Sequence, residues 1–195
     1  MNKVEEPDLT YSNYTYADYL KWRFDEQVEL IKGKIFKMSP APMRIHQEIS
    51  REISIRIFNF LNGKKCEAYS APFDVRLPVK SKKNEDITTV VQPDICVICD
   101  PDKLDDAGCI GAPDIVIEIL SKGNSKKELQ NKYEVYEESG VKEYWIVYPE
   151  QQSILVYTLI DEKYQPSRLL TKGDKITTQI LPGFVLNLDE VFEEE

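Results

Sequence analysis

Two acidic residues stand among apolar residues, where burial would penalise a charge. Asp94 precedes the run Ile95–Cys99, and Glu118 lies inside the run Ile115–Leu120. Moving even a neutral polar group out of water without a partner costs roughly 2–7 kcal/mol, and an isolated charge costs more. A carboxylate in such a strand is therefore expected to be paired with a cation, to bind a metal or to do acid–base chemistry.

Strand geometry predicts how these two carboxylates could meet. Side chains alternate along a strand, so Glu118 shares one face with Val116 and Leu120. If the two apolar runs are neighbouring strands, Asp94 and Glu118 converge at one edge of a sheet. Two carboxylates form a hard oxygen site, which makes both residues candidate ligands of Mg²⁺ or Mn²⁺. A structural role is open for each, because Asp94 could begin a strand after Pro93 and Glu118 could form a core salt bridge.

A lysine on the following predicted helix is a candidate cation for this site. Lys132 borders an apolar stripe formed by Leu129, Tyr133 and Tyr136. Its long stem can lie along the core while its ammonium reaches a carboxylate. The alternative is a surface pair with Glu128, four residues earlier, which would be worth only about 0.3–0.5 kcal/mol.

The chain has a single histidine, His46. It falls among Ile45, Ile49 and Ile53 on the apolar face of a predicted helix, so it is expected to point inward. A histidine there is either a core residue or a participant in the chemistry. Mechanisms that need two histidines, such as H-E-x-x-H zinc hydrolysis, are excluded.

The four cysteines, at positions 66, 96, 99 and 109, are too sparse for a disulfide scaffold. Cys96 and Cys99 form a C-x-x-C pattern within a predicted strand. Positions three apart on a strand point to opposite faces, so this pair cannot hold one zinc ion. We therefore expect Cys96 and Cys99 to be buried structural thiols. The phosphate-binding patterns G-x-x-x-x-G-K-[ST] and G-x-G-x-x-G are both missing from the sequence.

The composition indicates one globular domain. The chain has 195 residues, of which 42% are hydrophobic, and this length suits one sizeable core. The formal net charge of −9 argues against a protein that depends on non-specific affinity for nucleic acid, although a small basic groove remains possible. No apolar run approaches the roughly 18 residues of a membrane span, and the N-terminus is polar. A cytoplasmic protein is expected.

The residue pattern predicts a flexible tail over 1–15 and one α/β domain over 16–195, built around a mixed sheet. Helices are predicted over 16–22, 44–62 and 124–138. A hairpin that turns at Gly33 is predicted over 28–38, and the segments 80–89 and 100–113 are predicted to be loops. Further strands are predicted over 67–69, 73–77, 94–99, 114–120, 143–147, 154–160, 177–181 and 184–188.

Three groups of residues carry a resemblance to a known family. The first is E-L-I-x-G-x-I from Glu29, followed by M-S-P at 38–40 and by His46 near the start of a helix. The second is PDI at 93–95 with GAPDIVIEILS at 111–121. The third comprises Lys132, Tyr136, GVKEYWIV at 140–147 and Pro149. In this order they resemble the Uma-two family of restriction-endonuclease-like proteins, within the PD-(D/E)XK nuclease superfamily.

The resemblance covers the chain from about residue 16 to its end. It implies a restriction-endonuclease-like fold, with an N-terminal hairpin and C-terminal β additions around the core. Asp94 would be the aspartate of the PD motif, and Glu118 the acidic residue of the (D/E)XK motif. His46 matches the histidine at the head of the first core helix, and Glu29 matches an acidic residue of the first hairpin whose role is not defined.

The sequence departs from the superfamily signature at one catalytic position. Leu120 stands where the superfamily usually has lysine, and Lys132 matches a lysine that this family carries on the following helix. A second difference lies at position 148. This chain has Tyr148 before Pro149, where family members often have aspartate.

The resemblance implies hydrolysis of phosphodiester bonds in DNA, assisted by Mg²⁺ or Mn²⁺ bound at Asp94 and Glu118. Lys132 would orient the attacking water or neutralise the transition state, with His46 as a further catalytic candidate. The rival interpretation is a nuclease-fold binding module without catalysis, which the acidic composition favours. A homodimer is expected in either case, and no membrane partner.

Overall fold

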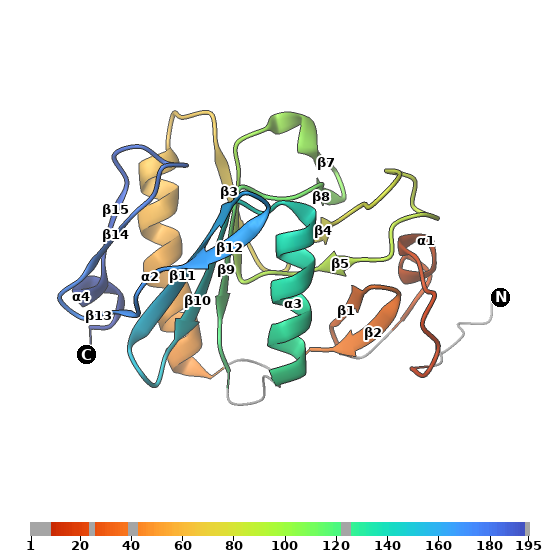
Figure 1. Ribbon diagram of the computed structural model, residues 1–195, viewed down its shortest axis with the longest axis horizontal. Helices are drawn as coiled ribbons and strands as arrows, with labels where there is room; N and C mark the ends of the chain where they lie inside the picture. Colours follow the sequence, from red (N-terminus) through yellow and green to blue (C-terminus); the bar gives the residue numbers. More distant parts are fainter. Residues whose placement is uncertain (1–8, 24–25, 39–42, 122–125, 194–195) are drawn as a thin grey trace.

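The apolar runs of the sequence build a central sheet with a helix on each face (Figure 1). The computed structural model describes residues 9–23, 26–38, 43–121 and 126–193. The central sheet has the strand order β12-β11-β10-β9-β6-β3, with β13 paired to β11. Its strands are β3 (Glu67–Ser70), β6 (Ile95–Ile98), β9 (Ile115–Ile119), β10 (Glu143–Tyr148), β11 (Ser153–Ile160), β12 (Lys163–Pro166) and β13 (Leu170–Thr171).

Two further sheets and four helices complete the fold of the described residues. The second sheet has the order β2-β1-β5-β4-β8-β7, and a third pairs β14 with β15. Their strands are β1 (Val28–Ile31), β2 (Lys34–Lys37), β4 (Val75–Arg76), β5 (Val90–Val91), β7 (Leu104–Asp105), β8 (Gly108–Ile110), β14 (Lys175–Thr177) and β15 (Val185–Asn187). The helices are α1 (Tyr16–Tyr19), α2 (Arg44–Leu61), α3 (Lys126–Ser139) and α4 (Leu188–Val191), with a 3₁₀ turn at Pro101–Lys103. None of the helices in the described part of the chain is long and apolar enough to cross a bilayer.

The two most apolar runs are neighbouring strands, which is the condition under which Asp94 and Glu118 were expected to converge. Strands β6 and β9 pair antiparallel, with Ile95 opposite Ile117. Strands β9 and β10 pair in parallel and are the two strands that α3 separates in the sequence. The chain that joins two parallel strands has to cross over one face of the sheet, usually as a helix, and α3 is that helix here. The alternation along β9 therefore directs Glu118 toward one helix and its neighbours toward the other.

The two faces of the central sheet pack against different helices (Figure 1). Ile115, Ile117 and Ile119 of β9 lie in one core cluster with residues of α2. Val116 lies in a second cluster with Val135 and Tyr136 of α3 and with residues of the second sheet. Because both faces are covered, β9 is buried along its whole length.

The N-terminal hairpin belongs to the second sheet and reaches α3. The sequence prediction of a hairpin turning at Gly33 is confirmed by β1 and β2. Gly33 has a φ of +76°, and a Cβ there would lie 2.7 Å from the Ser12 carbonyl oxygen, so only glycine fits without strain. Lys32 in the same turn contacts Glu138 of α3 at 2.9 Å. The hairpin is thereby held against the helix that carries Lys132.

Several details differ from the predicted elements. Ile45 was assigned to the apolar face of its helix, yet 45% of its surface is exposed, because α2 begins only one residue earlier. The predicted loop 100–113 contains β7 and β8. The predicted strand 177–181 overlaps β14 only at Thr177, whereas β5, β12 and β13 were not predicted. The start predicted for the third helix, at 124, lies outside the described residues.

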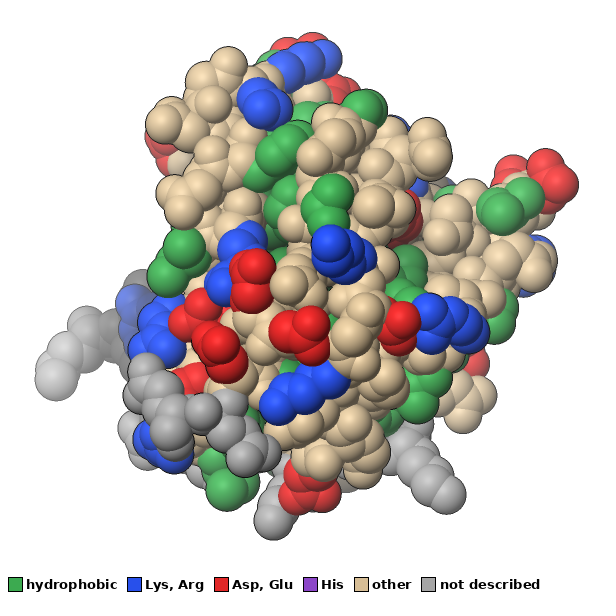
Figure 2. Space-filling view, turned by 90° about the vertical axis from the view of Figure 1, so that its left-hand side faces the viewer, with side chains coloured by type: hydrophobic (Ala, Val, Ile, Leu, Met, Phe, Trp, Pro, Cys, Tyr) green, Lys and Arg blue, Asp and Glu red, His purple; other side chains and the backbone are tan. Residues whose placement is uncertain are grey.

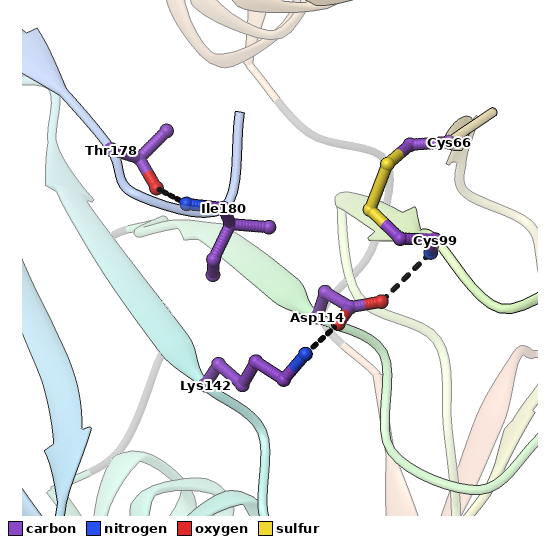
Figure 3. Close-up of a disulfide and its surroundings, with 6 residues drawn as sticks. All are labelled: Cys66, Cys99, Asp114, Lys142, Thr178 and Ile180. Atoms are coloured by element: carbon purple, nitrogen blue, oxygen red, sulfur yellow. Dashed lines mark hydrogen bonds and ion pairs between the residues drawn. A yellow bond between two sulfur atoms is a disulfide. The ribbon is translucent and has the colours of Figure 1, made fainter. Parts of the chain in front are cut away.

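The prediction that Cys96 and Cys99 are buried structural thiols is confirmed for Cys96 and wrong for Cys99. Cys66 and Cys99 form a disulfide, while Cys96 and Cys109 are free and buried (Figure 3). Cys66 precedes β3 and Cys99 follows β6, and these antiparallel strands pair with Glu67 opposite Ile98. The register therefore places the two cysteines opposite each other, which sequence spacing alone does not reveal.

The Cys99 end of this bond is also fixed to β9 (Figure 3). The backbone N–H of Cys99 donates to Asp114 Oδ2 at 2.7 Å, and Lys142 Nζ lies 2.6 Å from Asp114 Oδ1. Asp114 thus has a structural role, since it links the neighbouring strands at the end far from Glu118.

Reducing this disulfide is expected to destabilise the protein by about 2–4 kcal/mol, because the bond closes a loop of 33 residues in the unfolded chain. Urea unfolding with and without reductant measures the difference. A Cys66→Ser, Cys99→Ser variant should show the lower stability and should no longer respond to reductant. Equal stability of the oxidised and reduced wild type would contradict the expectation.

Candidate active site

The structure brings Asp94 and Glu118 together at one end of the adjacent strands β6 and β9, on the edge of the central sheet that these strand ends form. Asp94 directly precedes β6, and the antiparallel register places it opposite Glu118 of β9. The Asp94 carboxylate is held against β9 because its Oδ2 atom accepts a hydrogen bond of 2.7 Å from the backbone N–H of Ile119. The predicted convergence of the two carboxylates is therefore a feature of the fold.

Glu118 is buried and is held by two side chains of α3. Its Oε1 atom accepts hydrogen bonds from Lys132 Nζ at 2.9 Å and from the Tyr136 hydroxyl at 2.7 Å. Lys132 and Tyr136 are four residues apart, so they lie on one face of the helix. Lys132 is itself only 4% exposed. This contact with Glu118 and this burial favour the core position of Lys132 over the surface pair with Glu128.

Glu29 is the second partner of the Lys132 ammonium. The distance from Lys132 Nζ to Glu29 Oε1 is 3.0 Å, and the same oxygen accepts a 2.8 Å hydrogen bond from the Gln92 backbone N–H. Glu29 is 2% exposed and lies within the buried strand β1. Sequence analysis matched Glu29 to the family without defining a role. The sequence feature that could have singled out Glu29 is the one that singled out Glu118, namely a carboxylate inside an apolar strand.

His46 approaches the site from the opposite side of the sheet. It lies in the first turn of α2 and is 7% exposed, so the prediction that it points inward is confirmed. Its Nε2 atom lies 3.3 Å from Asp94 Oδ2. Its Nδ1 atom is buried and has no hydrogen-bond partner among the residues that the structure describes. His46 therefore touches the carboxylate that Ile119 also holds.

Burial and neighbouring charges shift the pKa values of these groups. Burial raises the pKa of Glu118, Lys132 opposes this, and the charges of Asp94 and Glu29 raise it further. Burial alone would lower the pKa of Lys132, but Glu118 and Glu29 outweigh it and raise the value, so Lys132 stays protonated at neutral pH. Burial also opposes the charged form of His46, but the hydrogen bond and charge of Asp94 prevail and raise its pKa.

The donor set fits a hard divalent cation with few protein ligands. No cluster of three or more metal-ligating side chains occurs within the described ranges. The two carboxylates are nevertheless available, because the hydrogen bonds within the described part of the chain engage only Asp94 Oδ2 and Glu118 Oε1. Mg²⁺ is usually held by one or two carboxylates, together with water and substrate phosphate oxygens. Asp94 and Glu118 match this pattern.

The fold is that of a restriction-endonuclease-like protein. A crystal structure described as "a putative nuclease belonging to DUF820 from Anabaena variabilis ATCC 29413" has a similar fold, with a TM-score of 0.72. The alignment covers 92% of this chain and 97% of that chain at 20% sequence identity. No curated protein matches the chain.

The family model "Uma2: Putative restriction endonuclease" matches residues 16–189. The chain belongs to this family. The predicted family and fold class are thus confirmed, whereas the roles of Asp94, Glu118, Lys132 and His46 stay predictions. The proposed division into a tail over 1–15 and a domain over 16–195 also stays a prediction, and residues 1–8 lie outside the described part.

The buried position of Lys132 makes a quantitative prediction. Lys132→Met should lower the free energy of unfolding by about 3–5 kcal/mol, because it leaves two buried carboxylates without their cation. Lys163→Met is the matched control, since Lys163 pairs with Glu137 on the surface, and it should change stability far less. Urea unfolding measures both variants. Similar values for the two would contradict the role of Lys132 as a buried counter-ion.

Proposed function

We propose that the protein is a metal-dependent endonuclease that hydrolyses phosphodiester bonds in DNA. The observation that carries this proposal is the meeting of Asp94, Glu118 and protonated Lys132 at one sheet edge. Membership of a family described as restriction endonucleases supports it. A purely structural role would leave unexplained why two carboxylates converge there with oxygens free to bind.

Asp94 and Glu118 would hold Mg²⁺ or Mn²⁺ through their unengaged oxygens. The ion would lower the pKa of a bound water and stabilise the charge that develops on the phosphate. Asp94 is the more open of the two, with a side chain 21% exposed, and it is held in place by Ile119 and His46. We infer that His46 positions Asp94 and that Asp94 faces the substrate.

Lys132 would supply a fixed positive charge to the reaction. An ammonium has three N–H donors, and Glu118 and Glu29 take two of them. The third is available for the attacking water or for a phosphate oxygen. Because both carboxylates keep Lys132 protonated, it acts by electrostatic stabilisation rather than as a general base.

The acidic surface favours the rival function, a nuclease-fold binding module. The face formed by α2, α4, β14 and β15 mixes acidic and basic side chains and shows no continuous basic patch (Figure 2). Several of these charges pair with each other, as Arg56 does with Glu52 and Glu190. The DNA substrate stays a prediction of the nuclease proposal, whereas a homodimeric assembly and a cytoplasmic location stay predictions of either function.

Calorimetric titration with Mn²⁺ and Mg²⁺ tests the proposed metal site directly. We expect saturable binding to the wild type and at least a tenfold loss of affinity in Asp94→Asn and in Glu118→Gln. Glu143→Gln is the matched control, because Glu143 is a buried carboxylate of β10 that is bound instead by Thr178 and Trp145. Circular dichroism verifies that each variant is folded.

The titration also separates the two functions. Metal binding that depends on Asp94 and Glu118, but not on Glu143, supports the nuclease and justifies cleavage assays over a range of DNA substrates. Wild-type protein that shows no saturable binding at millimolar metal would overturn the metal site and leave the binding module as the better proposal.

A further inference from the structure

A small apolar pocket opens beside the candidate active site. Its volume is about 290 Å³, and the residues that line it include Met43, Ile45, His46, Leu120, Tyr148 and Pro149. These residues come from the first turn of α2, the end of β9 and the turn that follows β10. All three segments lie at the same end of the central sheet (Figure 1). This volume is at the small end of the range for ligand pockets, about 300–1,000 Å³.

The strand register connects this pocket to the carboxylates. Ile146 of β10 lies beside Glu118 of β9, and Tyr148 is two residues further along the same face. The Leu120 backbone N–H donates to the Val147 carbonyl at 2.9 Å, which keeps the ends of the two strands together. Tyr148 is thus displaced from the level of Glu118 by about 6–7 Å along the strand.

His46 is common to the pocket and the site. It lines the pocket, while its Nε2 atom contacts Asp94. The pocket wall also includes the first turn of α2, an 18-residue helix without acidic residues in that turn. The positive end of a helix favours a phosphate nearby. A ligand that fills the pocket would therefore have its anionic part near the first turn of α2, beside the ion proposed at Asp94 and Glu118.

We propose that this pocket binds an unpaired base of the DNA strand whose phosphate lies at Asp94 and Glu118. The inference rests on the proposed nuclease function and specifies its substrate as single-stranded or locally unpaired DNA. A base that remains stacked in a duplex cannot enter a pocket of this kind. The walls suit a base, because the Tyr148 ring offers a stacking surface and the aliphatic side chains offer apolar contact.

The charge of the chain is consistent with this mode of recognition. A protein with a net charge of −9 gains little from general attraction to phosphates. Stacking of bases on aromatic rings is tolerant of sequence, because every base has a π-face. Base capture at Tyr148 would thus provide affinity that the acidic surface does not.

Fluorescence anisotropy with a labelled short oligothymidylate tests the pocket. The probe is measured as a single strand and within a hairpin duplex, in Ca²⁺ and in EDTA, for the wild type, Tyr148→Ala and Tyr148→Phe. The matched control is Tyr69→Ala, because Tyr69 is a half-buried strand tyrosine that stacks on Phe73 away from the pocket. We expect preference for the single strand, a loss of about tenfold or more in Tyr148→Ala, and little change in the other two variants.

The outcomes distinguish this inference from the nuclease proposal. Failure of the wild type to bind the single strand, equal binding of both probes, or no effect of Tyr148→Ala would each overturn the base pocket. The metal titration would then decide the nuclease separately. Conversely, strand binding that depends on Tyr148 in a protein without a metal site would retain the pocket and overturn the nuclease.

Discussion

The contact on which the structure most depends is the buried ammonium of Lys132 between Glu118 and Glu29. Each partner comes from a different part of the fold, because Lys132 lies on α3, Glu118 on the central sheet and Glu29 on the N-terminal hairpin. Burying any one of these charges alone would cost several kcal/mol, so each element needs the others in place. The second sheet is therefore part of the site, since it supplies the carboxylate that holds Lys132 from the far side.

The two carboxylates of the candidate metal site are positioned in different ways. Glu118 is buried and directed by side chains of α3, whereas Asp94 is more exposed and directed by the Ile119 backbone and by His46. A buried carboxylate beside an ammonium has a fixed orientation, while an open one can exchange water for a ligand. In the proposed nuclease, Glu118 would therefore anchor the ion and Asp94 would contact the substrate.

The sequence predicted those parts of the site that depend on local patterns. The apolar runs predicted both strands, and alternation along β9 predicted that Asp94 would meet Glu118 if those strands were neighbours, as they are. Helical spacing predicted that His46 is buried, but it also placed Ile45 inside, because periodicity does not show where a helix passes the edge of a sheet. The pairs Glu29–Lys132 and Cys66–Cys99 join distant segments through tertiary register, and local spacing contains no information about that register.

The charge balance of the site itself argues for a cation between the protein and its substrate. Glu29, Glu118 and Asp94 carry three carboxylates against the single ammonium of Lys132, so the formal charge is negative when His46 is neutral. A phosphate that approached this edge directly would be repelled. A divalent ion at Asp94 and Glu118 would remove the excess negative charge and turn the same edge into a phosphate site. A binding module that bound DNA at this edge without a metal ion would gain no affinity from the carboxylates. Their arrangement therefore favours the proposed metal-dependent enzyme over the binding module.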